Sequence, residues 1–402
     1  MKIPYTTEVK ISKVIKSSKN FFLFGYNSVA KQTIQKYKKS TFKKIFDNSK
    51  KVWGFQFHGI EIVNPSIIKK LKKFVIIICS TSYVDICKQL ENYGLKPEIN
   101  FFVSPYLNHL KKINEIESIQ KKILFACGNK PQKNPKYGGG LYLLTINKSN
   151  WKYKKIYSGN CHGLLKVKKN YYLVDDYAGI IKFSQKFKKL KIIYIENNLR
   201  PHGLSYDDKF KKFYLSCTNK DLVKVYNKNF ILEKNIFISK KILKNKVKNH
   251  HVNDCLIIKN KLYVSMFSLS GKNSIDLFDG GVIEINLRTN KKKVIFKDLI
   301  MPHSIHFFNK RLHILDSFKG RILIDDGSHI SNLPGFVRGL DLDDDNYYIG
   351  QSRNRNYYKL KTNDRNVSLD TGILILNIKN KLTRFIQLDP RLNEIHSLKI
   401  VK

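Results

Sequence analysis

A short motif recurs along the later part of the chain and constrains the fold more than any other feature of the sequence. Each copy has a polar residue, an apolar run of strand length, a brief turn and a second apolar run. The full copies read "NCHGLLKVKKNYYLVDD", "RPHGLSYDDKFKKFYLSC", "HVNDCLIIKNKLYVSMF", "MPHSIHFFNKRLHILDS" and "GFVRGLDLDDDNYYIGQS". A half-length copy, "EIHSLKIV", lies at the C-terminal end. Such self-similarity is typical of repeat architectures.

Two further strand-like runs follow the motif, as "GIIKF" and "KIIYI" do after the first copy. Four strands per repeat predict the blades of a β-propeller. Upstream of the first full copy, "KILFACG", "GGLYLLTI" and "WKYKKIY" supply three strands that lack an opening strand, and "EIHSLKIV" supplies one. We therefore expect these two segments to complete one blade together. The sequence predicts a six-bladed propeller over residues 121–402.

The polar residues that open the repeats are expected at one mouth of the central channel. In an antiparallel blade, the start of the first strand and the end of the second lie at the same end. The long connections "GNKPQKNPKYG", "FSLSGKNSIDLFDG" and "QSRNRNYYKLKTNDRNVSLDT" are predicted on this face as well, and binding sites are usually built where long loops gather. The six opening residues are His162, His202, Asn253, His303, Arg338 and His396.

The first hundred residues have a different pattern. "NFFLFGYNSVAKQTIQKYKK" and "KFVIIICSTSYVDICKQLENYG" each read as a buried strand, a turn and a helix. Continuous apolar strands that alternate with helices indicate a parallel sheet covered on both faces. We expect an extension over residues 1–18, a small Rossmann-like α/β domain over 19–105 and a connector helix over 106–120. The chain is thus predicted to join an α/β domain to an all-β domain.

The turn after the first strand matches a dinucleotide-binding motif poorly. Such a turn needs G-x-G-x-x-G so that backbone amides can approach a pyrophosphate. Here it reads Gly25-Tyr26-Asn27-Ser28-Val29-Ala30. The domain nevertheless resembles the small Rossmann-like domain found beside sugar-modifying enzymes and methyltransferases of surface-polysaccharide pathways. The matching residues are Asp47, Asn48, Gly59, Ile62, Pro65 and Ser80. Nucleotide-sugar binding and a docking scaffold both remain open.

Two resemblances concern the propeller. "LPGFVRGLDLDDDNYYIGQSRNR", "MPHSIHFFNKRLHILDS" and "TGILILNI" resemble a family of bacterial proteins known only as a domain of unknown function. That resemblance covers most of residues 121–402 and implies a propeller fold without a settled activity. "RPHGLS" and "HVNDC" are similar to pieces of calcium-dependent lactonases, arylesterases and gluconolactonases. This second resemblance implies that Asn253 and Asp254 hold a metal and that His202 acts as a base.

The repeated histidines have three interpretations. Imidazoles from different blades can converge on a metal, and four neutral imidazoles suit iron, zinc or copper. Asn253 with Asp254 suits a harder ion such as calcium. The same side chains can instead form a metal-free pocket, or each can bond to the backbone of the next blade. If the protein is an enzyme, we expect His202 and His303 to be catalytic.

Other polar residues are predicted on the same face. Arg338 and Arg353, with Arg355, can grip a carboxylate or phosphate in a bidentate manner, although Arg338 can also pair with "DLDDD". Asp176 and Asp316 end second strands and can face a ligand or form turns. His250 and His251 are expected in an exposed loop. The predicted ligand-binding set is His162, Arg338, His396, Arg353, Asp316 and Asp176.

Composition limits the partners and the compartment. The net charge of +44 raises nucleic acid as a partner, but the lysines are spread through every segment and no aromatic platform or reader motif accompanies them. The six cysteines form no CxxC pair, so buried free thiols are expected. No run has the length of a signal peptide or a membrane span, which predicts a cytoplasmic protein.

These features favour a propeller that binds a small molecule or glycan-like ligand at the channel mouth, in a cell-surface carbohydrate pathway. The first alternative is a metal-dependent hydrolase or lactonase, with calcium, zinc or iron as the expected ion. The second alternative is a protein-interaction scaffold, because a fold alone does not define a function.

Overall fold

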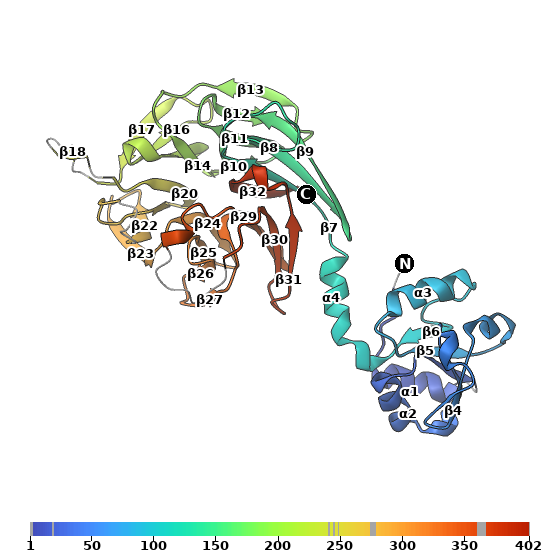
Figure 1. The fold of residues 1–402 in the computed structure, drawn as a ribbon. Coiled ribbons are helices and arrows are strands. Elements are labelled where there is room, and N and C mark those ends of the chain that lie inside the picture. Colours follow the sequence, from blue (N-terminus) through green and yellow to red (C-terminus); the bar gives the residue numbers. More distant parts are fainter. Residues whose placement is uncertain are drawn as a thin grey trace. The chain divides into compact units, whose positions relative to one another are not determined.

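The chain forms two compact units, Met1–Ile116 and Glu117–Lys402, which are described separately (Figure 1). The computed structural model describes residues 3–17, 20–239, 242–243, 246–247, 249–273, 279–359 and 367–401. Parts of two predicted long connections, residues 274–278 and 360–366, lie outside the described residues.

The first unit contains a mixed sheet with the strand order β3-β4-β2-β1-β5-β6. Neighbouring strands run parallel except β3, which pairs antiparallel with β4. The strands are β1 (Phe21–Phe24), β2 (Phe42–Phe46), β3 (Gln56–Phe57), β4 (Ile60–Val63), β5 (Val75–Ile78) and β6 (Phe101–Val103). The α-helices are α1 (Glu8–Ser17), α2 (Ser28–Tyr37), α3 (Tyr83–Asn92) and α4 (His109–Glu117). The predicted parallel sheet therefore carries an antiparallel edge strand that the sequence analysis did not include.

Apolar side chains on the two faces of this sheet build two separate cores. Phe22 and Phe24 pack in one core with residues of α3, including Ile86. Phe21 and Leu23 pack in the other core with residues of α1 and α2. All four residues of β1 are buried because successive side chains of a strand point to opposite faces and both faces are covered.

Among the described residues, the second unit forms six antiparallel sheets of four strands each, which are the blades of a propeller (Figure 1). The predicted six-bladed propeller is confirmed. From the inner to the outer edge, the blades are β10 (Cys161–Val167), β11 (Asn170–Asp175), β12 (Gly179–Phe183) and β13 (Lys189–Ile193); β14 (Pro201–Asp207), β15 (Lys212–Cys217), β16 (Leu222–Tyr226) and β17 (Leu232–Phe237); β20 (Val252–Ile258), β21 (Lys261–Met266), β22 (Gly280–Asn286) and β23 (Lys292–Leu299); β24 (Pro302–Phe308), β25 (Arg311–Asp316), β26 (Arg321–Ile324) and β27 (His329–Ile330); β28 (Phe336–Leu342), β29 (Asn346–Ser352), β30 (Gly372–Asn377) and β31 (Thr383–Gln387); and β32 (Ile395–Val401), β7 (Gln120–Cys127), β8 (Gly140–Asn147) and β9 (Asn150–Ser158). A two-stranded ribbon, β18 (Ile242–Leu243) and β19 (Lys246–Val247), precedes β20.

The inner strands form a closed ring. Each first strand contacts the first strand of the next blade, in the order β10, β14, β20, β24, β28 and β32, and β32 contacts β10. The ring is closed within one blade, where β32 pairs antiparallel with β7 from Ile395 opposite Cys127 to Val401 opposite Lys122. The half-length repeat thus completes the blade that begins with β7, as the sequence analysis predicts.

Burial is greater in the second strand of a blade than in the strand at the channel, and it is lowest at the outer edge. Five of the six residues of β11 are buried, whereas β9 at the outer edge has no buried residue. All six cysteines are free and buried, as expected. No helix in the described part of the chain is both long enough and apolar enough to cross a membrane.

Candidate functional site

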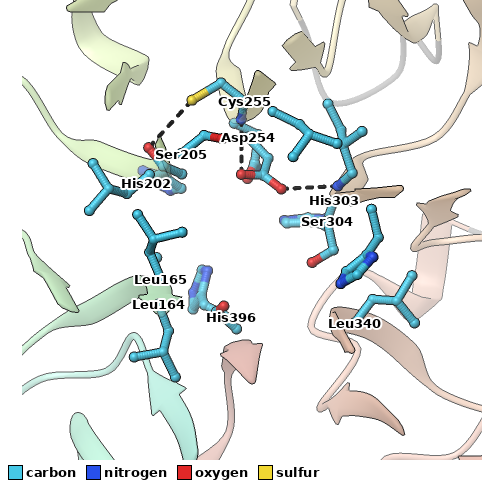
Figure 2. Close-up of a pocket in the computed structure, with 18 of the residues that line it drawn as sticks. Leu164, Leu165, His202, Ser205, Asp254, Cys255, His303, Ser304, Leu340 and His396 are labelled. Carbon is cyan, nitrogen blue, oxygen red and sulfur yellow. Dashed lines mark hydrogen bonds between the residues drawn. The ribbon is translucent and has the colours of Figure 1, made fainter. Parts of the chain in front are cut away.

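Each of the six opening residues of the repeats lies in a β-bulge, or directly at its edge, near the start of the first strand of its blade. In each of the six blades, the pairing of the first two strands shifts register at this point. A bulge breaks the alternation of side chains and turns one of them in a new direction. It therefore lets a polar side chain at the start of an otherwise apolar strand face the channel. Five of the six residues, His162, His202, Asn253, His303 and His396, line a cavity of about 190 Å³, and Arg338 does not. Figure 2 shows His202, His303 and His396 around this cavity.

Three of the histidines form a cluster from three consecutive inner strands, β32, β10 and β14. One ring nitrogen from each of His162, His202 and His396 lies within 4.8 Å of the other two. The ring of His162 stacks on that of His202 with centroids 4.3 Å apart, and it meets His396 edge-on at 4.4 Å. The ring of His303 lies further away, with its centroid 6.4 Å from that of His396. The four predicted histidines thus divide into a group of three and a single ring.

The hydrogen bonds of His202 define its tautomer. Its Nδ1 lies 3.1 Å from the carbonyl oxygen of Arg200 and 3.2 Å from Oγ1 of Thr218. The Thr218 hydroxyl donates its own hydrogen to the carbonyl of Val252, at 2.6 Å. Both neighbours of Nδ1 therefore accept, so Nδ1 carries the proton and Nε2 keeps the lone pair.

The same reasoning applies to His303. Its Nδ1 lies 2.8 Å from the carbonyl oxygen of Met301 and 2.7 Å from Oγ of Ser317. Because a carbonyl oxygen only accepts, Nδ1 donates and Nε2 keeps the lone pair. His202 and His303 bond to backbone atoms of their own segments and not to the neighbouring blade. Blade-to-blade bonds come from other side chains, such as Ser205, which accepts from the amide of Ile257 at 3.1 Å.

His162 has no hydrogen-bond partner for either ring nitrogen among the described residues, although its side chain is only 6% exposed. A buried polar atom without a partner costs roughly 1–3 kcal/mol. Gly128 makes room for this arrangement, because a Cβ at that position would lie 3.1 Å from Cε1 of His162 and 2.4 Å from Cδ2 of His396. The ring is therefore packed tightly, although neither of its nitrogens forms a hydrogen bond with the described residues.

Arg338 and Glu394 form a buried ion pair beside the cluster. Nη1 of Arg338 lies 2.8 Å from Oε2 of Glu394, and Nη2 of Arg355 lies 2.6 Å from Oε1. Nε2 of His396 lies 3.0 Å from Oε2 of the same carboxylate. The guanidinium of Arg338 also covers the ring of Phe336 at 4.7 Å. Burial alone would raise the pKa of Glu394, but the charges of Arg338 and Arg355 and the bond to His396 hold that pKa well below its ordinary range.

The histidines of the mouth are neutral near pH 7. Burial holds the pKa of His162, His202 and His303 well below the ordinary range, and nearby arginine charges act in the same direction. Burial and the charge of Arg338 lower the pKa of His396 to about 4 despite its bond to Glu394. The mouth thus offers uncharged imidazoles surrounded by guanidinium groups.

Asn253 and Asp254, the residues suggested as calcium ligands, both line the cavity, and the carboxylate of Asp254 bonds to the backbone. Oδ1 of Asp254 accepts from the amide of Cys255 at 2.9 Å, and Oδ2 accepts from the amide of Ile305 at 3.0 Å (Figure 2). Burial raises the pKa of Asp254 to about 6. Of the described residues that line the cavity, Asp254 is the only one with a carboxylate. Ca²⁺ takes six to eight oxygen ligands, so a calcium site at Asn253 and Asp254 stays a prediction.

Three further predicted site residues lie outside the cavity lining. Asp316 accepts from the amide of Ile300 at 2.9 Å and pairs with Arg321 at 2.8 Å, so it holds a turn and an ion pair. Asp176 accepts from Nδ2 of Asn160 at 3.2 Å. Arg353 is exposed. The structure does not bring these three side chains to the histidine cluster.

Several residues of the mouth were not predicted from the sequence. Glu394 and Arg200 each lie two positions before a repeat histidine, in "EIH" and "LRPH", and this spacing is the signal that could have found them. His250 is buried and not exposed as expected, with Nδ1 2.9 Å from the carbonyl of Ser268. His251 stacks on Phe267 with ring centroids 4.2 Å apart. Burial and the charge of Arg200 lower the pKa of His251 to about 3.

These observations define the class of the protein: a six-bladed β-propeller whose channel mouth is lined by neutral histidines. The model of the family described as "Domain of unknown function (DUF4915)" matches residues 153–402, which is more than half of the chain. The chain belongs to this family, and the predicted resemblance is confirmed.

Several solved structures are similar to the chain. A chain of a nidogen/laminin complex matches with a TM-score of 0.50 and 12% identity, over 71% of this chain and 99% of that chain. A protein from Lactobacillus plantarum matches with a TM-score of 0.46 and 14% identity, over 71% and 100%. A putative gluconolactonase matches with a TM-score of 0.40 and 12% identity, over 57% and 78%. At 12% identity, the nidogen/laminin likeness shows a shared fold and nothing of function. No curated protein sequence matches the chain.

Proposed function

We propose that the propeller binds a small, anionic, glycan-like ligand at the channel mouth. The observation that carries this proposal is the cavity of about 190 Å³ into which His202, His303 and His396 project from different blades (Figure 2). Nε2 of His202 and of His303 keeps a lone pair and can accept from a hydroxyl group. Pockets for drug-sized ligands occupy about 300–1,000 Å³, so the ligand here is smaller, such as a single sugar ring.

The charges around the mouth favour an acidic ligand. Arg338 and Arg355 both pair with the carboxylate of Glu394. The charge of Arg200 lies close enough to act on the pKa values of His162, His202 and Asp176, each of which it lowers. With Lys399, which lines the cavity, these three guanidinium groups make four positive charges, against the three carboxylates of Glu394, Asp176 and Asp254, which leaves a net positive charge. Guanidinium groups bind carboxylates and phosphates through paired hydrogen bonds. A sugar acid combines the hydroxyls that suit the imidazoles with the charge that suits the arginines.

We expect glucuronate to bind the protein more tightly than glucose in titration calorimetry. The two molecules differ in one carboxylate, so their difference in affinity measures the charge preference of the mouth. Arg200→Ala should weaken the binding of glucuronate about fivefold, which corresponds to about 1 kcal/mol for a partly exposed charge pair, and should leave glucose unaffected.

Arg311→Ala is the matched control. Arg311 begins β25 at the end of its blade opposite the mouth and faces Asp325 and Asp326, so its loss should leave the binding of both sugars unchanged. Equal affinity for glucuronate and glucose, or an equal loss in both variants, would contradict the proposal.

A metal-dependent hydrolase of the lactonase or arylesterase type is the second candidate, and the orientation of His303 favours it. The Met301 carbonyl and Ser317 fix the ring through Nδ1, which leaves Nε2 as a general base at the cavity. We expect His303→Ala to reduce the hydrolysis of a small lactone at least 100-fold if the protein is such an enzyme. Lactone hydrolysis that is the same with and without the protein would exclude this candidate.

For the first unit, we propose a Rossmann-like scaffold of a surface-carbohydrate protein that binds dinucleotides poorly. Oδ1 of Asn27 accepts from the amides of Val29 and Ala30 at the start of α2, at 2.9 and 3.2 Å. Nδ2 of Asn27 donates to the carbonyl of Cys79 at 2.8 Å. The amides that a phosphate would use are therefore already bonded.

A further inference from the structure

We propose that His162, His202 and His396 together bind one divalent transition-metal ion, with zinc as the representative ion. The three rings come from adjacent inner strands, and one nitrogen of each lies within 4.8 Å of the others. In a tetrahedral zinc site with bonds of about 2.0–2.1 Å, the ligand nitrogens lie about 3.4 Å apart. The rings of His162 and His202 are stacked, and an imidazole lone pair lies in the plane of its ring, so the ring of His162 must turn out of this stack for the three nitrogens to meet at one ion.

His162 is the residue that most requires such an ion. His162 is only 6% exposed, and neither of its ring nitrogens has a hydrogen-bond partner among the described residues. A ring that only fills space would be better replaced by an apolar residue, because an unsatisfied buried nitrogen is costly. A metal ion bound to one ring nitrogen of His162 would supply the partner that this buried side chain lacks among the described residues.

The other two rings are held as metal ligands usually are. Metal-bound histidines donate their second ring nitrogen to a carbonyl or a carboxylate, which fixes the ring and its tautomer. Nδ1 of His202 has the Arg200 carbonyl as its acceptor, at 3.1 Å. Nε2 of His396 lies 3.0 Å from Oε2 of Glu394 and 3.1 Å from Nη1 of Arg338, which also donates to Glu394. When the proton of His396 is on Nε2, Glu394 is its acceptor and Nδ1 keeps the lone pair. Each of these two rings therefore keeps one lone pair for an ion.

The chemistry of the donors selects the kind of ion. Neutral imidazoles suit zinc, iron and copper, whereas calcium and magnesium require oxygen ligands. Among the described residues of the cavity lining, Asp254 alone has a carboxylate, and it already accepts from two backbone amides. Three protein ligands also leave a fourth position of a tetrahedral ion open.

The test uses the full chain, purified without a histidine tag and stripped with a chelator. After zinc is added and excess removed, elemental analysis should find one zinc ion per chain. Cobalt(II) in place of zinc should give the intense visible absorption of a four-coordinate nitrogen site. His162→Ala and His202→Gln should each weaken zinc binding at least 100-fold in a competition with a chromogenic chelator, with an unchanged far-ultraviolet circular dichroism spectrum.

His313→Ala is the matched control, because His313 is another buried histidine of the propeller whose ring packs on Phe308 and Tyr347. Its zinc content should equal that of the unmodified chain. If the unmodified chain binds no zinc and gives no cobalt spectrum, the proposal is wrong even if a variant fails to fold. Zinc that remains bound in both His162→Ala and His202→Gln would also overturn it. Neither result depends on whether a sugar acid binds.

Discussion

A chain shortened after Glu394 should lose the cooperative unfolding transition of the propeller. The missing strand β32 is the inner strand of its blade, and it contacts both β10 and β28 in the ring. Ile395 and Leu398 are 0% exposed and Ile400 is 6% exposed. Each such side chain contributes about 1.5–3 kcal/mol on burial, so their sum approaches the 5–15 kcal/mol that stabilises a typical domain.

Circular dichroism melting and limited proteolysis of the second unit would measure this loss. In the matched variant, residues 395–401 are moved ahead of β7 through a short linker, so that the same two strands form a local hairpin. Because β32 pairs antiparallel with β7, this variant should recover the transition. A shortened chain that melts at the same temperature as the full chain would show that β32 does not close the ring.

Replacement of Glu394 by Gln should destabilise the propeller by about 3–5 kcal/mol, which is the usual cost of removing one partner from a buried ion pair. Glu394 is 7% exposed and Arg338 is 9% exposed. The substitution leaves the guanidinium of Arg338 buried without its counter-charge. Urea unfolding, followed by tryptophan fluorescence and circular dichroism, would measure the change in the free energy of unfolding.

Two further variants separate the charge effect from a packing effect. Arg338→Met combined with Glu394→Leu removes both charges and should recover much of the lost stability, because apolar replacements of a buried pair are often neutral or stabilising. Asp208→Asn removes one partner of the exposed pair with Lys211 and should leave the unfolding midpoint nearly unchanged. A double variant as unstable as Glu394→Gln would contradict this explanation.

The fold of the propeller could be predicted because each blade has a recognisable copy of the repeat in the sequence. Each copy places one polar residue before an apolar strand, so the copies could be counted and the split blade recognised. In the first unit, the edge hairpin of β3 and β4 was missed. Its turn, His58-Gly59, has positive φ at both residues, which is the conformation of a tight two-residue hairpin turn.

The detail of the site could not be predicted in the same way. The repeat places six polar residues at equivalent positions, but it does not show that a bulge turns each of them. The separation of His303 from the cluster depends on the rings that pack around it, such as Phe267 and Phe336 at 5.3 and 5.8 Å. The pairing of Arg338 with Glu394 joins residues 56 positions apart, and no short motif records it.

The closure of the ring also means that one blade can be completed only after nearly the whole propeller has been synthesised. β7 receives its partner β32 only after the ribosome has made the chain from Cys127 to Ile395, which takes on the order of half a minute at about 5–20 residues per second. Until then β7 is an unpaired sheet edge that contains the apolar residues Ile123, Leu124 and Phe125. Such an edge can recruit strands from other nascent chains. Lys121 and Lys122 follow the first residue of this strand, and charges of this kind oppose such association until β32 has been made.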